Sequence, residues 1–191
     1  AALSLWGVVW ATGAALPARA MWPALLVMGF LNNAVPFTLF VLAQGQITGA
    51  LASVLNAMTP VFTVLVAHLA TRDEKLTPAR GLGVVLGFAG VLAMLADGGM
   101  SGTRLALLAC LGAAFSYAVA SVWGRRFRAA GLTPLATAFG QVTASSALML
   151  QVWLLVDRPW ALHWPGWEPV MAVLGLASLS SALAYLIFFR I

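Results

Sequence analysis

Charged side chains are scarce in this 191-residue chain, which has ten Lys and Arg residues and five Asp and Glu residues. They make up 8% of the chain, whereas roughly a quarter of the residues in a soluble domain are charged. This scarcity excludes an ordinary soluble globular domain. The longest stretches without any charge are residues 20–71, 105–124, 129–156 and 169–189.

Cysteine and central ionisable groups are also lacking. The single cysteine, Cys110, lies inside an apolar stretch, which excludes a disulfide framework and a thiolate metal site. No Asp, Glu, Lys or Arg lies at the centre of any apolar stretch. Neither a carboxylate proton relay nor a cationic anchor for phosphate is therefore visible. We predict no metal and no cofactor.

A retinal-binding receptor and a membrane-embedded serine protease would each need residues that this sequence does not have in the required places. A retinal-binding receptor needs a lysine in its last helix, but the only lysine, Lys75, lies between two apolar stretches. A membrane-embedded serine protease needs a Ser beside a His base, and neither His68 nor His163 is central in an apolar stretch. We predict that the protein is not an enzyme.

Long apolar stretches are what the chain does have, and 62% of its residues are hydrophobic. A helix of about 20 apolar residues crosses the hydrocarbon core of a bilayer. Pro23, Pro78 and Pro134 stand near the first turns of three stretches, where a missing N–H costs little. The sequence predicts an all-α polytopic bundle with seven spans, at 1–16, 23–43, 48–70, 78–96, 103–124, 134–156 and 169–189.

The basic residues are unevenly distributed over the short connections. The net charge of +5 therefore indicates membrane topology rather than binding of nucleic acid. One side receives only Arg104 and Arg158. Because basic connections face the cytoplasm, we expect the other side, where the first span ends, to be cytoplasmic. That side receives Arg19, Arg72, Lys75, Arg80, Arg125, Arg126, Arg128 and Arg190.

A weak internal repeat links the second span with the seventh. Residues 32–37 (Asn-Asn-Ala-Val-Pro-Phe) align with residues 180–185 (Ser-Ser-Ala-Leu-Ala-Tyr), and Phe40 aligns with Phe188. The second and seventh spans are five positions apart in the chain, an odd number, so the two copies would lie in the membrane in opposite directions. Inverted repeats of this kind are typical of transporters.

Residues 25–95 closely resemble the EamA-type family of the drug/metabolite transporter superfamily. The specific parts are the Ala-Ser-x-x-x-Asn-Ala-x-x-Pro core at 52–60, the Asp-Glu-Lys-Leu-Thr connection at 73–77 and the Gly-rich helix that follows. Residues 112–126 are more weakly similar to the helix that opens the family's second repeat.

The resemblance implies ten helices arranged as two inverted five-helix repeats. The seven spans would then be helices two to eight, so we expect a fragment without helices one, nine and ten. Residues 1–96 would hold four spans of the first repeat, and residues 103–191 would hold three spans of the second.

The resemblance also implies a permease of the inner (cytoplasmic) membrane that exports small neutral or zwitterionic metabolites such as amino acids. Two alternatives remain open: a non-transporting membrane bundle with a structural or interaction role, and a branch with another substrate, such as a nucleotide-sugar or phosphate carrier. Expected partners are a small solute and membrane lipid but not nucleic acid, and a homodimer is left open.

An Asn lies four residues before the proline in two spans: Asn32 before Pro36, and Asn56 before Pro60. Proline at position i removes the hydrogen bond to the carbonyl of residue i−4. Each freed carbonyl would stand beside an amide side chain, which suits a polar solute. The alternative is that these amides only satisfy neighbouring helices. The predicted cavity residues are Asn32, Asn33, Pro36, Asn56, Thr59, Pro60, Tyr117, Gln141 and Tyr185.

Glycines recur in the fourth span without polar neighbours on the same face. Gly83-x-x-x-Gly87 and Gly90 are spaced so that they share one side of a helix. Small residues at this spacing let helix backbones approach closely in a membrane. We therefore predict a role in helix packing for these three residues.

Overall fold

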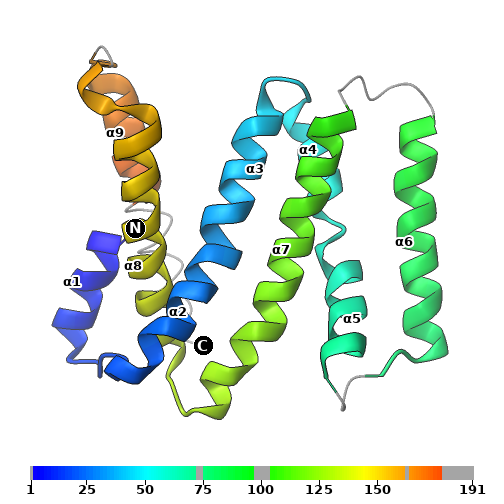
Figure 1. The fold of residues 1–191 in the computed structure, drawn as a ribbon, viewed down its shortest axis with the longest axis horizontal. Helices are drawn as coiled ribbons and strands as arrows, with labels where there is room; N and C mark the ends of the chain where they lie inside the picture. Colours follow the sequence, from blue (N-terminus) through cyan, green and yellow to red (C-terminus); the bar gives the residue numbers. More distant parts are fainter. Residues whose placement is uncertain (1, 72–74, 97–103, 162–163, 178–191) are drawn as a thin grey trace. The chain divides into compact units, whose positions relative to one another are not determined.

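The computed structural model describes residues 2–71, 75–96, 104–161 and 164–177. Throughout these residues the ordered elements are helical, which confirms the all-α prediction (Figure 1). In chain order they are α1 (Ala2–Thr12), η1 (Arg19–Met21), α2 (Trp22–Gly29), η2 (Phe30–Ala34), α3 (Val35–Gln44), α4 (Gly49–Asn56), α5 (Thr59–Ala70), α6 (Pro78–Ala96), α7 (Arg104–Ala129), α8 (Pro134–Val152), η3 (Trp153–Asp157), η4 (Pro159–Ala161) and α9 (Trp167–Gly175).

Four helical runs are long and apolar enough to cross a membrane: Arg19–Gln44, Gly49–Ala70, Arg104–Ala129 and Pro134–Asp157. Two shorter apolar helices, Ala2–Thr12 and Pro78–Ala93, accompany them. The predicted first span, 1–16, is too long: α1 ends at Thr12 because Gly13 takes a left-handed φ of 63°. Most of the predicted last span, 169–189, lies outside the described residues.

Helix starts follow the local rules that the sequence suggested. Pro23 and Pro134 occupy the first turn of α2 and α8, and Pro78 is the first residue of α6. Helix ends were less predictable. The predicted span 103–124 continues as α7 to Ala129, so Arg125, Arg126 and Arg128 lie on a helix and not in a connection. Cations are favourable near the carboxyl end of a helix.

The described chain forms two compact units, residues 1–30 with 127–191 and residues 31–126. The chain passes from the first unit to the second inside η2. These units divide the chain differently from the predicted repeats, 1–96 and 103–191, and the repeat assignment stays a prediction.

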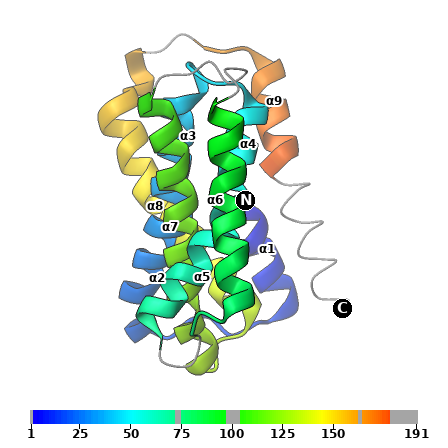
Figure 2. The same cartoon turned by 90° about the vertical axis from the view of Figure 1, so that its right-hand side faces the viewer.

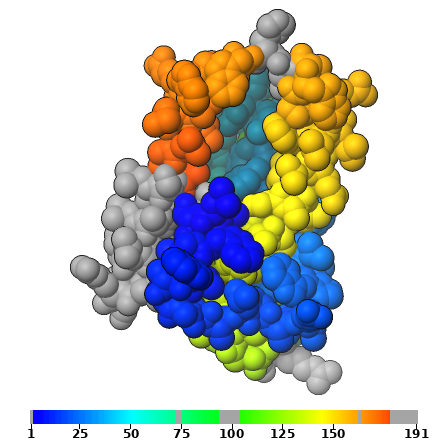
Figure 3. Space-filling model, turned by 90° about the vertical axis from the view of Figure 1, so that its left-hand side faces the viewer, coloured from blue at the N-terminus to red at the C-terminus, as the bar shows by residue number. Residues whose placement is uncertain are grey.

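In the first unit, α1 and α2 pack on α8. Leu5 and Val9 of α1 form a buried cluster with Leu135 and Phe139 of α8, and Figure 3 shows the blue N-terminal helix lying against the yellow side chains. The ring of Trp6 meets that of Phe139 edge-on, with their centroids 5.0 Å apart. Burial of this apolar surface fixes the two helices against each other within the unit.

Backbones approach most closely between α2 and α8. A Cβ atom added to Gly29 would lie 2.8 Å from the carbonyl oxygen of Gln141 and 2.8 Å from the backbone nitrogen of Ser145. One added to Gly140 would lie 2.6 Å from Cδ1 of Leu25. Two glycines thus allow the close approach of these helices.

In the second unit, small and aliphatic residues of α3, α4, α7 and the turn between α3 and α4 share a buried cluster. Its buried members are Ala43, Ile47, Leu51, Leu55, Ala106 and Cys110. Phe62 of α5 meets the rings of Phe88 on α6 and Phe115 on α7 edge-on, at centroid distances of 5.9 and 5.7 Å. Helix α6 accordingly stands beside α5 in two perpendicular views (Figure 1, Figure 2).

In the second unit, the basic residues are distributed unevenly between the two ends, as expected from the connections. Arg104 begins α7 at the end where the α3–α4 hairpin turns (Figure 1). Lys75 and Arg80 lie at the opposite end, where α6 begins, and Arg125 and Arg126 lie in the last turns of α7 at that same end. The direction of the bundle in the membrane stays a prediction.

Candidate functional site

The Asn-x-x-x-Pro segment at 56–60 interrupts its helix for two residues, which keep right-handed helical φ and ψ angles. Helix α4 ends at Asn56 and α5 begins at Thr59, with Ala57 and Met58 in a turn between them. The break falls inside the run Gly49–Ala70, which is long enough to span a membrane. From the start of α4, Asn56 is about 10 Å along the helix axis. A discontinuous helix within the bilayer is a usual place for a transporter to bind its solute.

A threonine hydroxyl compensates for the proline at this break. Thr59 Oγ1 donates to the Asn56 carbonyl oxygen over 2.7 Å and lies 3.4 Å from Oδ1 of the same residue. The carbonyl that Pro60 leaves without a helical N–H is therefore already hydrogen-bonded. This corrects the expectation that it stands free beside the amide. The amide nitrogen of Asn56 has no hydrogen-bond partner among the described residues.

The second Asn-x-x-x-Pro segment forms a π-helix. Asn32 and Asn33 lie in η2, directly before Pro36 in the first turn of α3. Single π turns inside α-helices are frequent at functional sites. In an i→i+5 pattern the carbonyl that Pro36 cannot serve is that of Leu31, whereas the sequence analysis expected Asn32. The hydroxyl of Ser116 donates to this Leu31 oxygen over 2.6 Å.

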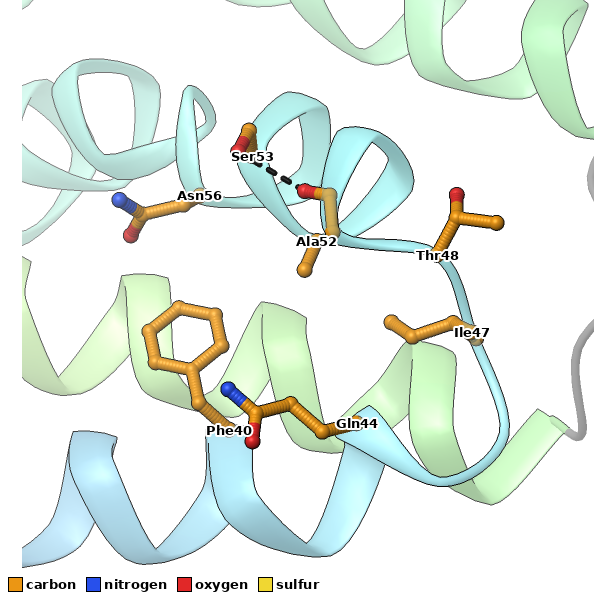
Figure 4. Close-up of a pocket in the computed structure, with 8 residues that line it drawn as sticks. Phe40, Gln44, Ile47, Thr48, Ala52, Ser53 and Asn56 are labelled. Carbon is orange, nitrogen blue, oxygen red and sulfur yellow. Dashed lines mark hydrogen bonds between the residues drawn. The ribbon is translucent and has the colours of Figure 1, made fainter. Parts of the chain in front are cut away.

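A cavity of about 240 Å³ lies between α3 and α4, at the hairpin that joins them (Figure 4). Asn56 of α4 and Phe40 of α3 lie across from each other, with the Gln44 amide beside the ring. The Ser53 hydroxyl turns back to the Gly49 carbonyl, 2.9 Å away. All lining residues are uncharged: Phe40, Gln44, Ile47, Thr48, Gly49, Ala52, Ser53 and Asn56.

Of the eight predicted cavity residues that the structure describes, only Asn56 lines this cavity. Tyr117 is half-buried on α7. Gln141 lies on α8 in the other compact unit, and its Oε1 is buried without a hydrogen-bond partner among the described residues. Tyr185 lies outside the described residues. Whether these residues bind a solute stays a prediction.

Phe40 and Gln44 line the cavity although they are not among the predicted cavity residues. They stand four residues apart on α3, as Ala52 and Asn56 do on α4. A four-residue turn, 45–48, joins the two helices. The hairpin places the two pairs on facing sides of the cavity.

The predicted packing glycines differ in their surroundings. A Cβ atom on Gly87 would lie 2.8 Å from Cγ2 of Val61 on α5, so this glycine stands at a close helix contact. At Gly83 and Gly90 no described atom lies within 4 Å of the added Cβ. Closer contacts are made by Gly29, where a Cβ atom would meet the α8 backbone, and by Gly140, where it would meet the Leu25 side chain. The signal for Gly140 was the spacing Ala136-x-x-x-Gly140-x-x-x-Ala144.

His68 has a structural partner at the end of α5. Its Nδ1 accepts a hydrogen bond from the Leu76 N–H over 3.0 Å, and the Lys75 ammonium donates to its carbonyl oxygen over 3.4 Å. The imidazole thus fastens the connection to α6. Within the described part of the chain, no group of three or more His, Cys, Asp or Glu residues is placed to hold a metal ion.

Comparison with known proteins identifies the family. Residues 1–96 match the sequence model of the EamA-like transporter family, and this segment contains α1 to α6. No curated protein and no solved structure matches the chain. Members of the matched family are transporters and not enzymes, in keeping with several apolar helices long enough to cross a membrane. The chain therefore belongs to the EamA-like transporter family and is a multi-pass membrane transporter.

Proposed function

We propose that this protein exports small neutral or zwitterionic metabolites, such as amino acids, across the cytoplasmic membrane, and that its solute binds at the Asn56 cavity. The observation that carries the proposal is the broken helix α4–α5 beside a cavity with two amides and no charge. The cavity is smaller than the roughly 300–1,000 Å³ of pockets for drug-sized ligands. A small metabolite suits this volume.

Zwitterions are favoured by the two helix ends that meet at the break. The carboxyl end of α4 carries partial negative charge and the amino end of α5 carries partial positive charge. An ammonium group and a carboxylate could therefore each meet a complementary end, and the Asn56 amide offers both a donor and an acceptor. Phosphate-bearing solutes are disfavoured, because none of the described residues that line the cavity is a cation.

Export rests on the family resemblance, and the positive-inside distribution supports the orientation on which it depends. With that orientation, the α3–α4 hairpin and the cavity beside it would face outward. A solute would then leave the protein from this side.

The test is uptake by proteoliposomes of radiolabelled L-alanine, L-threonine, L-leucine and L-phenylalanine. Asn56→Leu removes the amide without adding an unpaired polar group. Losing one or two hydrogen bonds in a dry site costs about 1–3 kcal/mol, so the half-saturation concentration should rise roughly ten- to a hundredfold.

Thr38→Val is the matched control, because Thr38 lies on α3 outside the cavity and its hydroxyl donates to the Ala34 carbonyl of its own helix. This variant should keep the wild-type half-saturation concentration. Uptake of all four amino acids at the rate of empty liposomes would refute the substrate class. Wild-type kinetics in Asn56→Leu would refute the site.

A further inference from the structure

Ser116 makes an unusual hydrogen bond within the second unit. It lies on α7, is only 5% exposed, and donates over 2.6 Å to the Leu31 carbonyl oxygen, 85 residues earlier in the chain. Several other Ser and Thr hydroxyls of the described chain donate instead to a carbonyl three or four residues back in their own helix. They include Thr12, Thr38, Ser53, Thr63, Thr71, Ser121 and Thr137.

The Leu31 carbonyl needs this donor because of two local features. It lies in the π-helix η2, where the backbone donor comes from five residues ahead. That residue is Pro36, which has no N–H. In a membrane interior water does not compensate for an unpaired carbonyl. The hydroxyl of Ser116 therefore takes the place of the missing N–H.

Small residues bring α7 close enough for this bond. Ala113, Ala114, Ala118 and Ala120 around Ser116 are fully buried. A Cβ atom on Gly112, one turn before Ser116, would lie 3.4 Å from Cδ1 of Leu39 on α3. Helix α7 thus contacts both the backbone of η2, at Leu31, and the middle of α3, at the Leu39 side chain.

We propose that Ser116 is a positioning residue for transport, which stabilises η2 as a pivot for α3. The hydroxyl satisfies Leu31 from outside the helix, so the backbone of η2 can shift between hydrogen-bonding patterns without leaving that carbonyl unpaired. Movement at η2 turns α3, which carries Phe40 and Gln44 of the Asn56 cavity. The inference rests on the proposed function only through this cavity.

The first arm of the test is a stability cycle that needs no solute. Ser116→Ala leaves the Leu31 carbonyl unpaired, and the midpoint of thermal unfolding in detergent should fall by about 2–8 °C. Pro36→Ala returns a backbone N–H to this stretch. Adding Ser116→Ala to Pro36→Ala should therefore leave the midpoint unchanged. An equal loss in both backgrounds would refute the compensation.

The second arm measures flux of the same four radiolabelled amino acids per folded molecule. Ser116→Ala should lower the maximal rate about tenfold, with the half-saturation concentration unchanged, if about 1.4 kcal/mol is lost during the movement. Pro36→Ala/Ser116→Ala should regain stability but not rate, because its η2 no longer has a proline to interrupt the helix. Recovery of rate together with stability would show that Ser116 is only structural and would overturn the proposal.

The matched control is Ser121→Ala, the same substitution five residues further along α7. The Ser121 hydroxyl donates within its own helix, to the Ala118 carbonyl over 3.0 Å. Its other contact is with the Thr63 hydroxyl, 3.4 Å away, which keeps its own bond to the Thr59 carbonyl over 2.8 Å. This variant should keep both the rate and the unfolding midpoint, and a tenfold loss of rate in it would refute the assignment to Ser116. If wild-type protein moves none of the four amino acids, the substrate class fails, while the stability cycle still decides whether the Ser116 hydroxyl compensates for the N–H that Pro36 lacks.

Discussion

The hydroxyl of Thr59 has the same task at the α4–α5 break that Ser116 has at η2. In each case proline removes a backbone donor and a side chain supplies another. A carbonyl without a partner attracts water or another polar group, and in a bilayer that is unfavourable. The two interruptions are therefore stable parts of the native helices and do not require bound water to exist.

The substitution Thr59→Val tests whether the hydroxyl of this residue stabilises the interrupted helix. Valine keeps the shape but leaves the Asn56 carbonyl without its 2.7 Å partner, so stability should fall by about 1–3 kcal/mol. Thr137→Val is the control, because the Thr133 carbonyl that accepts from its hydroxyl also accepts from its backbone N–H over 3.0 Å. Chemical unfolding followed by circular dichroism should show a loss for Thr59→Val alone. Equal losses would contradict this account.

The sequence predicted which residues to inspect at the breaks but not how their polar groups are satisfied. Asn56 and Pro60 were found from their spacing. The partner of the Leu31 carbonyl was not predicted, because Ser116 is distant in the sequence. The π-helix also moves the carbonyl without a backbone donor from Asn32 to Leu31. Phe40 and Gln44 were missed because their role depends on the α4 face opposite them.

At the scale of helices, close approach of α2 and α8 depends on glycine. Gly29→Ala would place a methyl group 2.8 Å from two backbone atoms of α8, which move only if the whole helix moves. Overpacking of this kind costs about 1–3 kcal/mol. Gly83→Ala meets no described atom within 4 Å and removes a flexible residue from a helix. Thermal unfolding should show a lower midpoint for Gly29→Ala only, and the reverse order would contradict the packing described.

Helix starts were easier to predict than helix ends and interruptions. Proline in the first turn and the threonine caps Thr48 and Thr133 act through neighbouring residues. No local signal ends α7 at the predicted residue 124, because the Arg residues that follow are good helix formers. The helix therefore continues to Ala129. The π geometry of η2 depends on α7, which follows much later in the chain.

At the scale of the whole molecule, the positive-inside distribution predicts which ends face the cytoplasm. In a Cys110→Ala background, single cysteines replacing Gln46 or Trp160 should react with an impermeant thiol reagent on intact cells. Cysteines replacing Lys75 or Arg80 should react only after permeabilisation. Those four native side chains are all exposed, so accessibility itself does not decide the outcome. The opposite labelling pattern would reverse the orientation.

Composition and charge were sufficient to predict an all-α membrane protein, and the family match agrees with that prediction. They were not sufficient to predict the two compact units. The first unit joins residues from both ends of the chain. Which helices pack together in this way depends on the shapes of their side chains. Small residues at helical spacing occur in several spans, so the sequence does not say which spans they bring together.

The contact between α2 and α8 has a consequence for biosynthesis. Residues 30–133 must be synthesised after α2 before α8 begins to emerge from the ribosome. At roughly 5–20 residues per second this takes on the order of ten seconds. During that interval the face around Gly29 has no native partner, and lipid or the insertion machinery must cover it. Slower translation of the middle spans would lengthen this exposure and increase the share of nascent chains degraded before assembly.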